Sequence, residues 1–277
     1  MEHRTPSKTA YAVARMRADH QILDGGQIFS DPYACAILGE QPEQTVMILK
    51  QDPNGLVART YMASRSRIGE DWLGAACDRG VRQAVILGAG FDTFGLRNPY
   101  PDLAVFEVDH PATQDWKRER LAAAGLAVPP SLSFTPVDFT KDELIPSLRK
   151  AGFDAQRPAF FLWLGVVPYL TEQNVFATLS AVAAIPGAEV VFDYSEPLEN
   201  YSAAQRPYIE AMAQKVSAAG EPWLSYFDPD TLATKLRELG FTEIEDLDRN
   251  AVVARVSDKQ SQERAVGPHL VRARRAG

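Results

Sequence analysis

The chain has 277 residues, 45% of them hydrophobic, which fits one large α/β domain with additions or two small domains. Its net charge of -7 argues against a general binder of nucleic acid or anionic membranes, which would be basic. No apolar run approaches the roughly 20 residues that cross a bilayer, and the first ten residues lack the apolar core of a secretion signal. We therefore expect a cytoplasmic protein that binds neither nucleic acid nor membranes.

The cysteines and histidines show no spacing that indicates a disulfide or a metal site. Cys35 and Cys77 lie far apart without a CxxC motif, which is typical of reduced thiols. The histidines at positions 3, 20, 110 and 269 form no metal-ligand pattern. We expect no metal.

The first 80 residues are predicted to be mostly helical and to form an N-terminal cap on the main domain. Helices are predicted over residues 7–23, 32–38 and 56–79, with a further short helix within residues 41–55. The helix over residues 56–79 carries Arg59 and Arg65 and stops at Gly80, a typical C-terminal glycine. No linker rich in Gly or Ser separates this cap from the rest of the chain.

Residues 81–257 alternate strands and helices, which predicts a doubly wound, mostly parallel sheet. Strands are predicted over residues 84–87, 104–108, 133–137, 159–164 and 189–194. Residues 242–247 and 251–256 are predicted to close the sheet as an antiparallel hairpin, residues 195–229 to form a helical lid insertion, and residues 258–277 to be a loose basic tail. Ligands of such sheets bind at the carboxyl ends of the strands.

The stretch from residue 84 to residue 114 carries the clearest functional signal. Gly88-Ala89-Gly90 follows the first strand, and glycines there allow a tight turn and close approach to a ligand. Asp109 ends the second strand about 20 residues later, where an acid can accept hydrogen bonds from both ribose hydroxyls. The pattern predicts a cofactor that contains a nucleoside. Asp138 and Phe139 follow the third strand at the same edge.

The residues after the glycine turn favour S-adenosylmethionine over a nicotinamide dinucleotide. Thr93 occupies the third small position of the dinucleotide fingerprint, so the diphosphate cradle is incomplete. Asp92 would repel a phosphate. S-adenosylmethionine has no phosphate and carries a positive sulfonium, so a short GxG turn with an acid nearby suits it better.

Several motifs resemble the leucine carboxyl methyltransferase family. They are LGAGFDT, FEVDHPATQ, the DF after the third strand, and WLGVVPYLT after the fourth. The closer resemblance is to its bacterial branch, which includes polyketide O-methyltransferases, and it covers nearly all of residues 5–250. It extends to SKTAYAVARMRADHQILDGGQIFSDPYA near the N-terminus and to GEPWLSYFDPDTLATKLRELGF. The resemblance implies a class I methyltransferase (Rossmann-like) fold of seven strands, with the last two as an antiparallel hairpin.

The resemblance also implies S-adenosyl-L-methionine as methyl donor, S-adenosyl-L-homocysteine as product, and O-methylation as the reaction. The 88–90 turn would line the methionine part of the cofactor, and Asp109 would hold the ribose hydroxyls. Asp138 would accept a hydrogen bond from the adenine amino group, with Phe139 as an apolar wall.

Arg65 would pair with the carboxylate of the cofactor. Arg59 is the alternative, because two similar segments around these arginines leave the alignment open. The eukaryotic carboxyl methyltransferases of the family place a glutamate where this chain has Leu164. This difference argues against a protein C-terminus as the acceptor.

The sequence offers two candidate catalytic bases, His20 in the cap and Tyr194 at the end of the fifth strand. Each is also explained as a packed residue. We expect an O-methyltransferase that acts on a phenol, enol or carboxyl group of a small molecule, in secondary metabolism. A protein or peptide carboxyl methyltransferase and a non-catalytic domain that binds S-adenosylmethionine are the alternatives. The oligomeric state stays open, a homodimer included.

Overall fold

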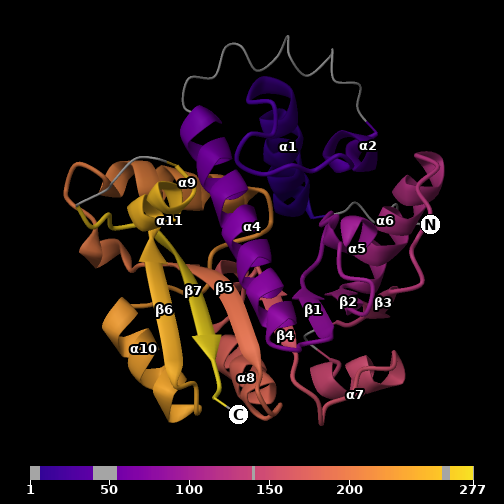
Figure 1. Ribbon diagram of the computed structural model, residues 1–277. Helices are drawn as coiled ribbons and strands as arrows, with labels where there is room; N and C mark the ends of the chain where they lie inside the picture. The colour runs from indigo at the N-terminus through magenta and orange to yellow at the C-terminus, as the bar shows by residue number, and fades with distance from the viewer. Residues whose placement is uncertain (1–6, 40–54, 139–140, 258–262, 277) are drawn as a thin grey trace.

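A seven-stranded sheet with the strand order β3-β2-β1-β4-β5-β7-β6 forms the centre of the protein (Figure 1). This computed structural model describes residues 7–39, 55–138, 141–257 and 263–276. The first five strands run parallel, and β7 lies antiparallel between β5 and β6. The strands are β1 (Gln83–Leu87), β2 (Ala104–Asp109), β3 (Leu132–Pro136), β4 (Phe160–Trp163), β5 (Glu189–Ser195), β6 (Glu243–Asp248) and β7 (Pro268–Arg274). The predicted mostly parallel sheet with an antiparallel end is confirmed.

The second strand of the closing hairpin does not lie where the sequence predicted it. Residues 251–256 belong to helix α11 (Arg249–Arg255), which begins where the Asp248 side chain accepts a hydrogen bond from the N–H of Ala251. The strand is β7, inside the predicted loose tail of residues 258–277, so that prediction is wrong for residues 268–274. An apolar run as short as residues 251–256 fits the repeat of a helix as well as that of a strand. The arginines within β7 interrupt its buried apolar residues, so the sequence did not indicate a strand there.

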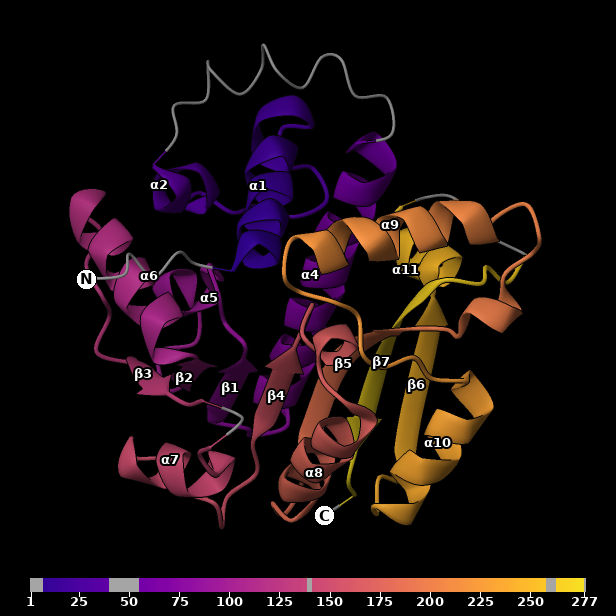
Figure 2. The same ribbon diagram turned by 180° about the vertical axis from the view of Figure 1, so that it is seen from behind.

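Helices cover both faces of the sheet (Figure 2). One face packs against α7 (Leu144–Lys150), α8 (Glu172–Ala183) and α10 (Pro229–Glu238), and the other packs against α4 (Gly55–Asp78), α5 (Phe94–Arg97) and α11. Alternate residues of β1 divide between the two cores: Val85 and Leu87 join the first, and Ala84 and Ile86 join the second. None of the helices in the described parts of the chain is long and apolar enough to span a membrane.

A third layer of helices lies over the carboxyl ends of the strands. It contains α1 (Lys8–Leu23), α2 (Ala34–Leu38) and α9 (Arg206–Ala218), seen above the sheet in Figures 1 and 2. A small core that includes Ala14, Ile37, Phe91 and Leu121 joins α1 and α2 to the main domain through α6 (Pro111–Ala123). The predicted helix over residues 41–55 lies outside the described residues, except for Gly55.

Candidate functional site

A cavity of about 980 Å³ runs along the carboxyl ends of the strands. Its walls include at least one residue at or just beyond this edge from each of the seven strands: Asp138 after β3, Asp109 of β2, Gly88 after β1, Gly165 after β4, Ser195 of β5, Pro268 of β7 and Arg249 after β6. The sheet topology therefore gathers the predicted polar groups around one space, as expected from the sequence.

The 88–90 turn lines this cavity and needs its glycines for two reasons. Gly88 and Gly90 have φ angles of +62° and +48°, in the region that favours glycine. A Cβ at Gly88 would overlap Cγ2 of Val166, and a Cβ at Gly90 would lie 3.3 Å from the Cβ of Ala10 in α1. The turn is therefore closely packed between the loop after β4 and the N-terminal cap.

Asp109 holds this turn with its carboxylate. Oδ2 accepts a hydrogen bond of 2.6 Å from the N–H of Gly90, and Oδ1 accepts one of 2.7 Å from the N–H of His110. Burial raises the pKa of Asp109, and the two backbone hydrogen bonds oppose that rise. Each carboxylate oxygen has two lone-pair sites, so both oxygens can accept a further hydrogen bond from a ligand.

Asp138 lines the same cavity beside Asp109. Its Oδ2 accepts a hydrogen bond of 2.8 Å from Nζ of Lys141, and its backbone N–H donates to Asp142. Phe139 lies outside the described residues. The adenine contacts proposed for Asp138 and Phe139 therefore stay predictions.

Arg65 reaches the cavity from α4 and forms a buried ion pair with Asp193 of β5. The other oxygen of Asp193 accepts a hydrogen bond of 2.6 Å from the N–H of Gly165. Arg65 is 4% exposed, and its Nε is buried without a hydrogen-bond partner. A buried donor without a partner is costly, so this nitrogen indicates an acceptor supplied by a ligand.

The structure also distinguishes Arg65 from Arg59. Arg59 donates two hydrogen bonds to Asp24, of 2.6 Å from Nε and 3.0 Å from Nη2, and it is not among the residues that line the cavity. Of the two arginines, Arg65 is the one that lines the cavity, and its pairing with the carboxylate of the cofactor stays a prediction.

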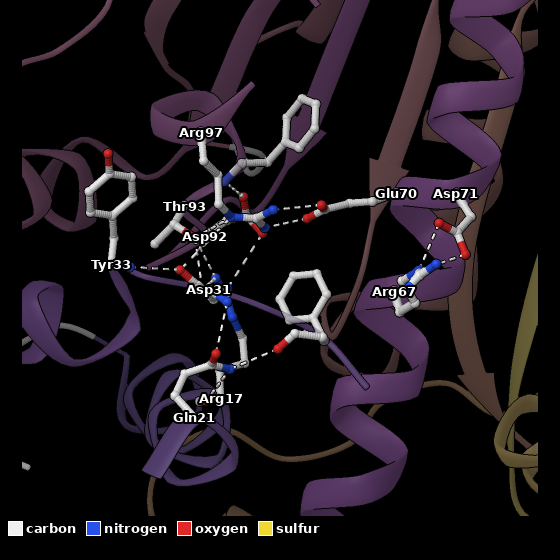
Figure 3. Close-up of polar contacts among 12 residues, drawn as sticks. Arg17, Gln21, Asp31, Tyr33, Arg67, Glu70, Asp71, Asp92, Thr93 and Arg97 are labelled. Atoms are coloured by element: carbon white, nitrogen blue, oxygen red, sulfur yellow. Dashed lines mark hydrogen bonds and ion pairs between the residues drawn. The ribbon is translucent and has the colours of Figure 1, made fainter. Parts of the chain in front are cut away.

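A buried ionic network joins the cap to the residues after the glycine turn (Figure 3). The Thr93 hydroxyl donates to Asp31 at 2.8 Å and accepts from Arg17 at 2.8 Å, and Arg17 also pairs with Asp31. Arg97 donates to the same Thr93 oxygen at 3.1 Å. In the sequence alone, Thr93 was only an interruption of a fingerprint. Two of its buried partners, Arg17 and Asp31, come from the N-terminal motif that carried part of the resemblance.

Neither candidate base lies on the cavity. His20 is 1% exposed, and its Nε2 accepts from the N–H groups of Ile28 and Phe29 while Nδ1 bonds to Asp24 at 2.9 Å. Tyr194 is 1% exposed, and its hydroxyl donates to Asp246 at 2.7 Å. Burial, followed by the charge of Asp246, raises the pKa of Tyr194. These positions support the packed-residue explanation for both side chains.

The segment predicted as a lid insertion, residues 195–229, supplies an aromatic wall at the other end of the cavity. The apolar side chains that line this end are Tyr201, Tyr208, Ile209, Met212, Trp223 and Tyr226. The segment is fixed to the short helix η1 (Val167–Tyr169) after β4 and to β5, because Leu224 donates to the carbonyl of Pro168 at 2.6 Å and Phe227 donates to that of Ser195 at 3.0 Å. Tyr208 is 62% exposed, so the cavity reaches the surface beside α9.

Glu221 connects the lid to the cap. Its carboxylate accepts hydrogen bonds from the N–H groups of Lys8 and Thr9, at 3.1 and 2.9 Å.

In the described ranges, no group of three or more His, Cys, Asp or Glu side chains is arranged so that it could hold a metal ion.

The sequence pattern of one protein family, leucine carboxyl methyltransferase, matches residues 10–183, more than half of the chain. The chain belongs to the leucine carboxyl methyltransferase family. The matched residues include most of the cap, the glycine turn, Asp109 and Arg65. The resemblance noted in the sequence is thereby confirmed, and so is S-adenosyl-L-methionine as the cofactor of this family member.

The relatives found by sequence are provisionally assigned as methyltransferases. YktD of Bacillus subtilis, provisionally named an S-adenosyl-L-methionine-dependent methyltransferase, is 38% identical over 254 residues, which cover 82% of this chain and 83% of the relative. A protein of Saccharopolyspora erythraea with the same provisional description is 34% identical over 183 residues, or 64% of this chain and 63% of that protein.

Solved structures support the fold. A DUF574 family protein from Streptomyces avermitilis superposes with a TM-score of 0.56 at 17% identity, covering 94% of this chain and 97% of that one. The magnesium protoporphyrin IX methyltransferase of Synechocystis, solved with bound S-adenosylhomocysteine, gives 0.51 at 10% identity, covering 95% and 100%. The predicted class I methyltransferase fold is confirmed, and this family member is an S-adenosylmethionine-dependent methyltransferase.

Proposed function

We propose that the protein transfers a methyl group from S-adenosylmethionine to an oxygen of a small, largely apolar acceptor. The observation that carries the proposal is the division of one cavity into two halves. Polar groups of β1, β2 and β3 line one half, and the aromatic side chains of the lid line the other. A phenol or enol hydroxyl, or a carboxyl group, on an aromatic skeleton would fit the second half.

The cofactor half contains groups that suit each part of S-adenosylmethionine. The glycines of the 88–90 turn let a ligand approach the backbone, and Asp109 offers two oxygens to the ribose hydroxyls. The unpartnered Nε of Arg65 suits the methionine carboxylate. Asp138 would accept a hydrogen bond from the adenine amino group, in the role that the resemblance to the family implies. These assignments are part of the proposal.

The cofactor supplies an electrophilic methyl group on a sulfonium, and the protein need mainly hold the acceptor oxygen in line with it. Among the described residues that line the cavity, one is a histidine, His110. It follows Asp109, and its Nδ1 accepts a hydrogen bond of 3.2 Å from the N–H of Ala112. It therefore lies in the cofactor half. In the proposed mechanism, the lid positions the acceptor and excludes water from the site.

Labelled S-adenosylmethionine, incubated with separate pools of phenols, aromatic acids and peptides, tests the proposal. We expect the label in phenols or aromatic acids. Tyr208→Ser should raise the KM for the acceptor and leave the affinity for S-adenosylhomocysteine unchanged. Label found in peptides alone would establish the peptide carboxyl methyltransferase instead. Cofactor binding without any methylated product would establish a non-catalytic domain.

A further inference from the structure

Two hydrogen-bond donors in the cavity wall have no protein partner. Tyr61, from α4, is 5% exposed, and its hydroxyl is buried without a hydrogen bond. Arg249, the first residue of α11, lines the cavity, and no ion pair or hydrogen bond joins its guanidinium to another described residue. Arg17 and Arg65, the other arginines of the described wall, are both paired with carboxylates.

The two donors lie within electrostatic reach of each other. Burial raises the pKa of Tyr61, Asp193 raises it further, and the charges of Arg65 and Arg249 oppose the rise. Burial also raises the pKa of Tyr201, in the lid, to about 12, and Arg249 again opposes the rise. Arg249 therefore lies within electrostatic reach of two tyrosines that line the cavity.

The sheet register places Arg249 at the end of a row across three strands. Ser195 of β5 pairs with Pro268 of β7, and Asp248 of β6 pairs with the next residue, His269. Arg249 follows Asp248, and it lines the cavity together with Ser195 and Pro268. Figure 2 shows α9 passing over this end of the sheet beside α11. The row spans two strand spacings, roughly 10 Å, from β5 across β7 to β6.

The charged groups beside Arg249 in this row are bound to other partners. Asp193 is paired with Arg65. Asp246 and Glu196 both bond to His269, and Glu196 also pairs with Arg264. The two carboxylate oxygens of Asp248 accept hydrogen bonds from the N–H groups of Ala251 and Ala265. The guanidinium of Arg249 is therefore left without a hydrogen-bonded carboxylate, which suits an anionic ligand.

We propose that Tyr61 and Arg249 bind a carboxylate of the acceptor, distinct from the oxygen that is methylated. The fork of a guanidinium matches the two oxygens of a carboxylate, and the tyrosine hydroxyl donates a third hydrogen bond. This inference rests on the proposed function and narrows its substrate class to hydroxylated aromatic or acyl acids. The carboxylate fixes the register of the acceptor along the cavity, and the hydroxyl receives the methyl group.

Binding to the protein saturated with S-adenosylhomocysteine tests this inference without turnover. The probes are a hydroxynaphthoate, with hydroxyl and carboxylate on opposite rings, and its neutral carboxamide. We expect the wild type to bind the acid at least about tenfold more tightly than the amide. Arg249→Gln should abolish this preference, and Arg249→Lys should keep part of it. Tyr61→Phe should weaken binding of the acid without lowering the melting temperature, because it removes a hydroxyl that has no partner.

Arg67→Gln is the matched control, since Arg67 is exposed on α4, pairs with Asp71 and does not line the cavity. It removes the same charge and should keep the preference for the acid. Equal binding of acid and amide by the wild type, binding of neither, or a preference that survives Arg249→Gln would each overturn the inference. Methylation of neutral phenols alongside such a result would leave the proposed function intact. Failure to methylate any hydroxyl or carboxyl compound would overturn the proposed function by itself.

Discussion

The Asp109 carboxylate accepts a 2.6 Å hydrogen bond from the N–H of Gly90, so the end of β2 holds the turn that follows β1. The same carboxylate accepts a second backbone hydrogen bond, from His110. A residue expected to bind the ribose is therefore also the residue that shapes the glycine turn. Cofactor binding and the geometry of the turn depend on one side chain.

We expect Asp109→Ala to weaken the binding of S-adenosylhomocysteine. The loss of hydrogen bonds to a charged group should cost about 1.5–3 kcal/mol, or roughly 10- to 150-fold in Kd, which isothermal calorimetry measures. Asp115→Ala removes an exposed carboxylate from α6 and should leave the affinity unchanged. An Asp109→Ala protein with wild-type affinity would contradict the ribose assignment.

Gly88→Ala should weaken cofactor binding and lower the melting temperature. The new Cβ would overlap Val166, and the φ of +62° is strained for any side chain. Gly125→Ala separates the two effects, because Gly125 has a φ of +67° with nothing within 4 Å of an added Cβ. It should show the backbone strain alone. An equal fall of the melting temperature in the two variants would show that the contact with Val166 has no effect on stability.

Arg65 and Arg59 should respond differently to the same substitution. Arg65→Gln should reduce the affinity for S-adenosylhomocysteine by about tenfold or more, because it removes the donors closest to the expected carboxylate. Arg59→Gln should lower the melting temperature through the loss of its two hydrogen bonds to Asp24, with the affinity unchanged. Calorimetry and thermal unfolding, run on both variants, measure the two effects. The reverse pattern would favour Arg59 as the cofactor ligand.

Much of this site could be predicted because its signals are local in the sequence. The glycine turn and Asp109 lie within one stretch of 22 residues, at the carboxyl ends of consecutive strands, so topology alone brings them together. Arg65 and Asp193 are separated by 128 residues, and nothing in the sequence identifies one as the partner of the other.

Other features depend on packing that a sequence pattern does not contain. The missing partners of Tyr61 and Arg249 are apparent only when every neighbour has been placed. Strand β7 escaped prediction because Arg272 and Arg274 interrupt its apolar residues, whereas in the sheet they pair with glutamates such as Glu189 and Glu243.

Stability should fall as pH rises above 6.5 because of His269. Its Nδ1 lies 2.8 Å from Asp246 and its Nε2 lies 3.0 Å from Glu196. Burial lowers its pKa, but the two carboxylates outweigh burial, so the pKa lies above 6.5 in the folded protein. The protonated ring therefore stabilises the fold fully below pH 6.5, and this stabilisation is lost as pH rises through the folded pKa.

Melting temperatures across this pH range measure the effect. His269→Gln should flatten the decline on the alkaline side, whereas His110→Gln, at an exposed position, should preserve its slope. A wild-type melting temperature that is constant or rises over this interval would contradict a charged His269.

A crystal structure with S-adenosylhomocysteine tests the central claim most directly, namely that one cavity holds donor and acceptor in separate halves. We predict the ribose hydroxyls on Asp109, the homocysteine carboxylate on Arg65, and the aromatic half beneath α9 left free for an acceptor. An adenosine bound among Tyr201, Trp223 and Tyr226, or a cofactor bound away from the 88–90 turn, would contradict the claim.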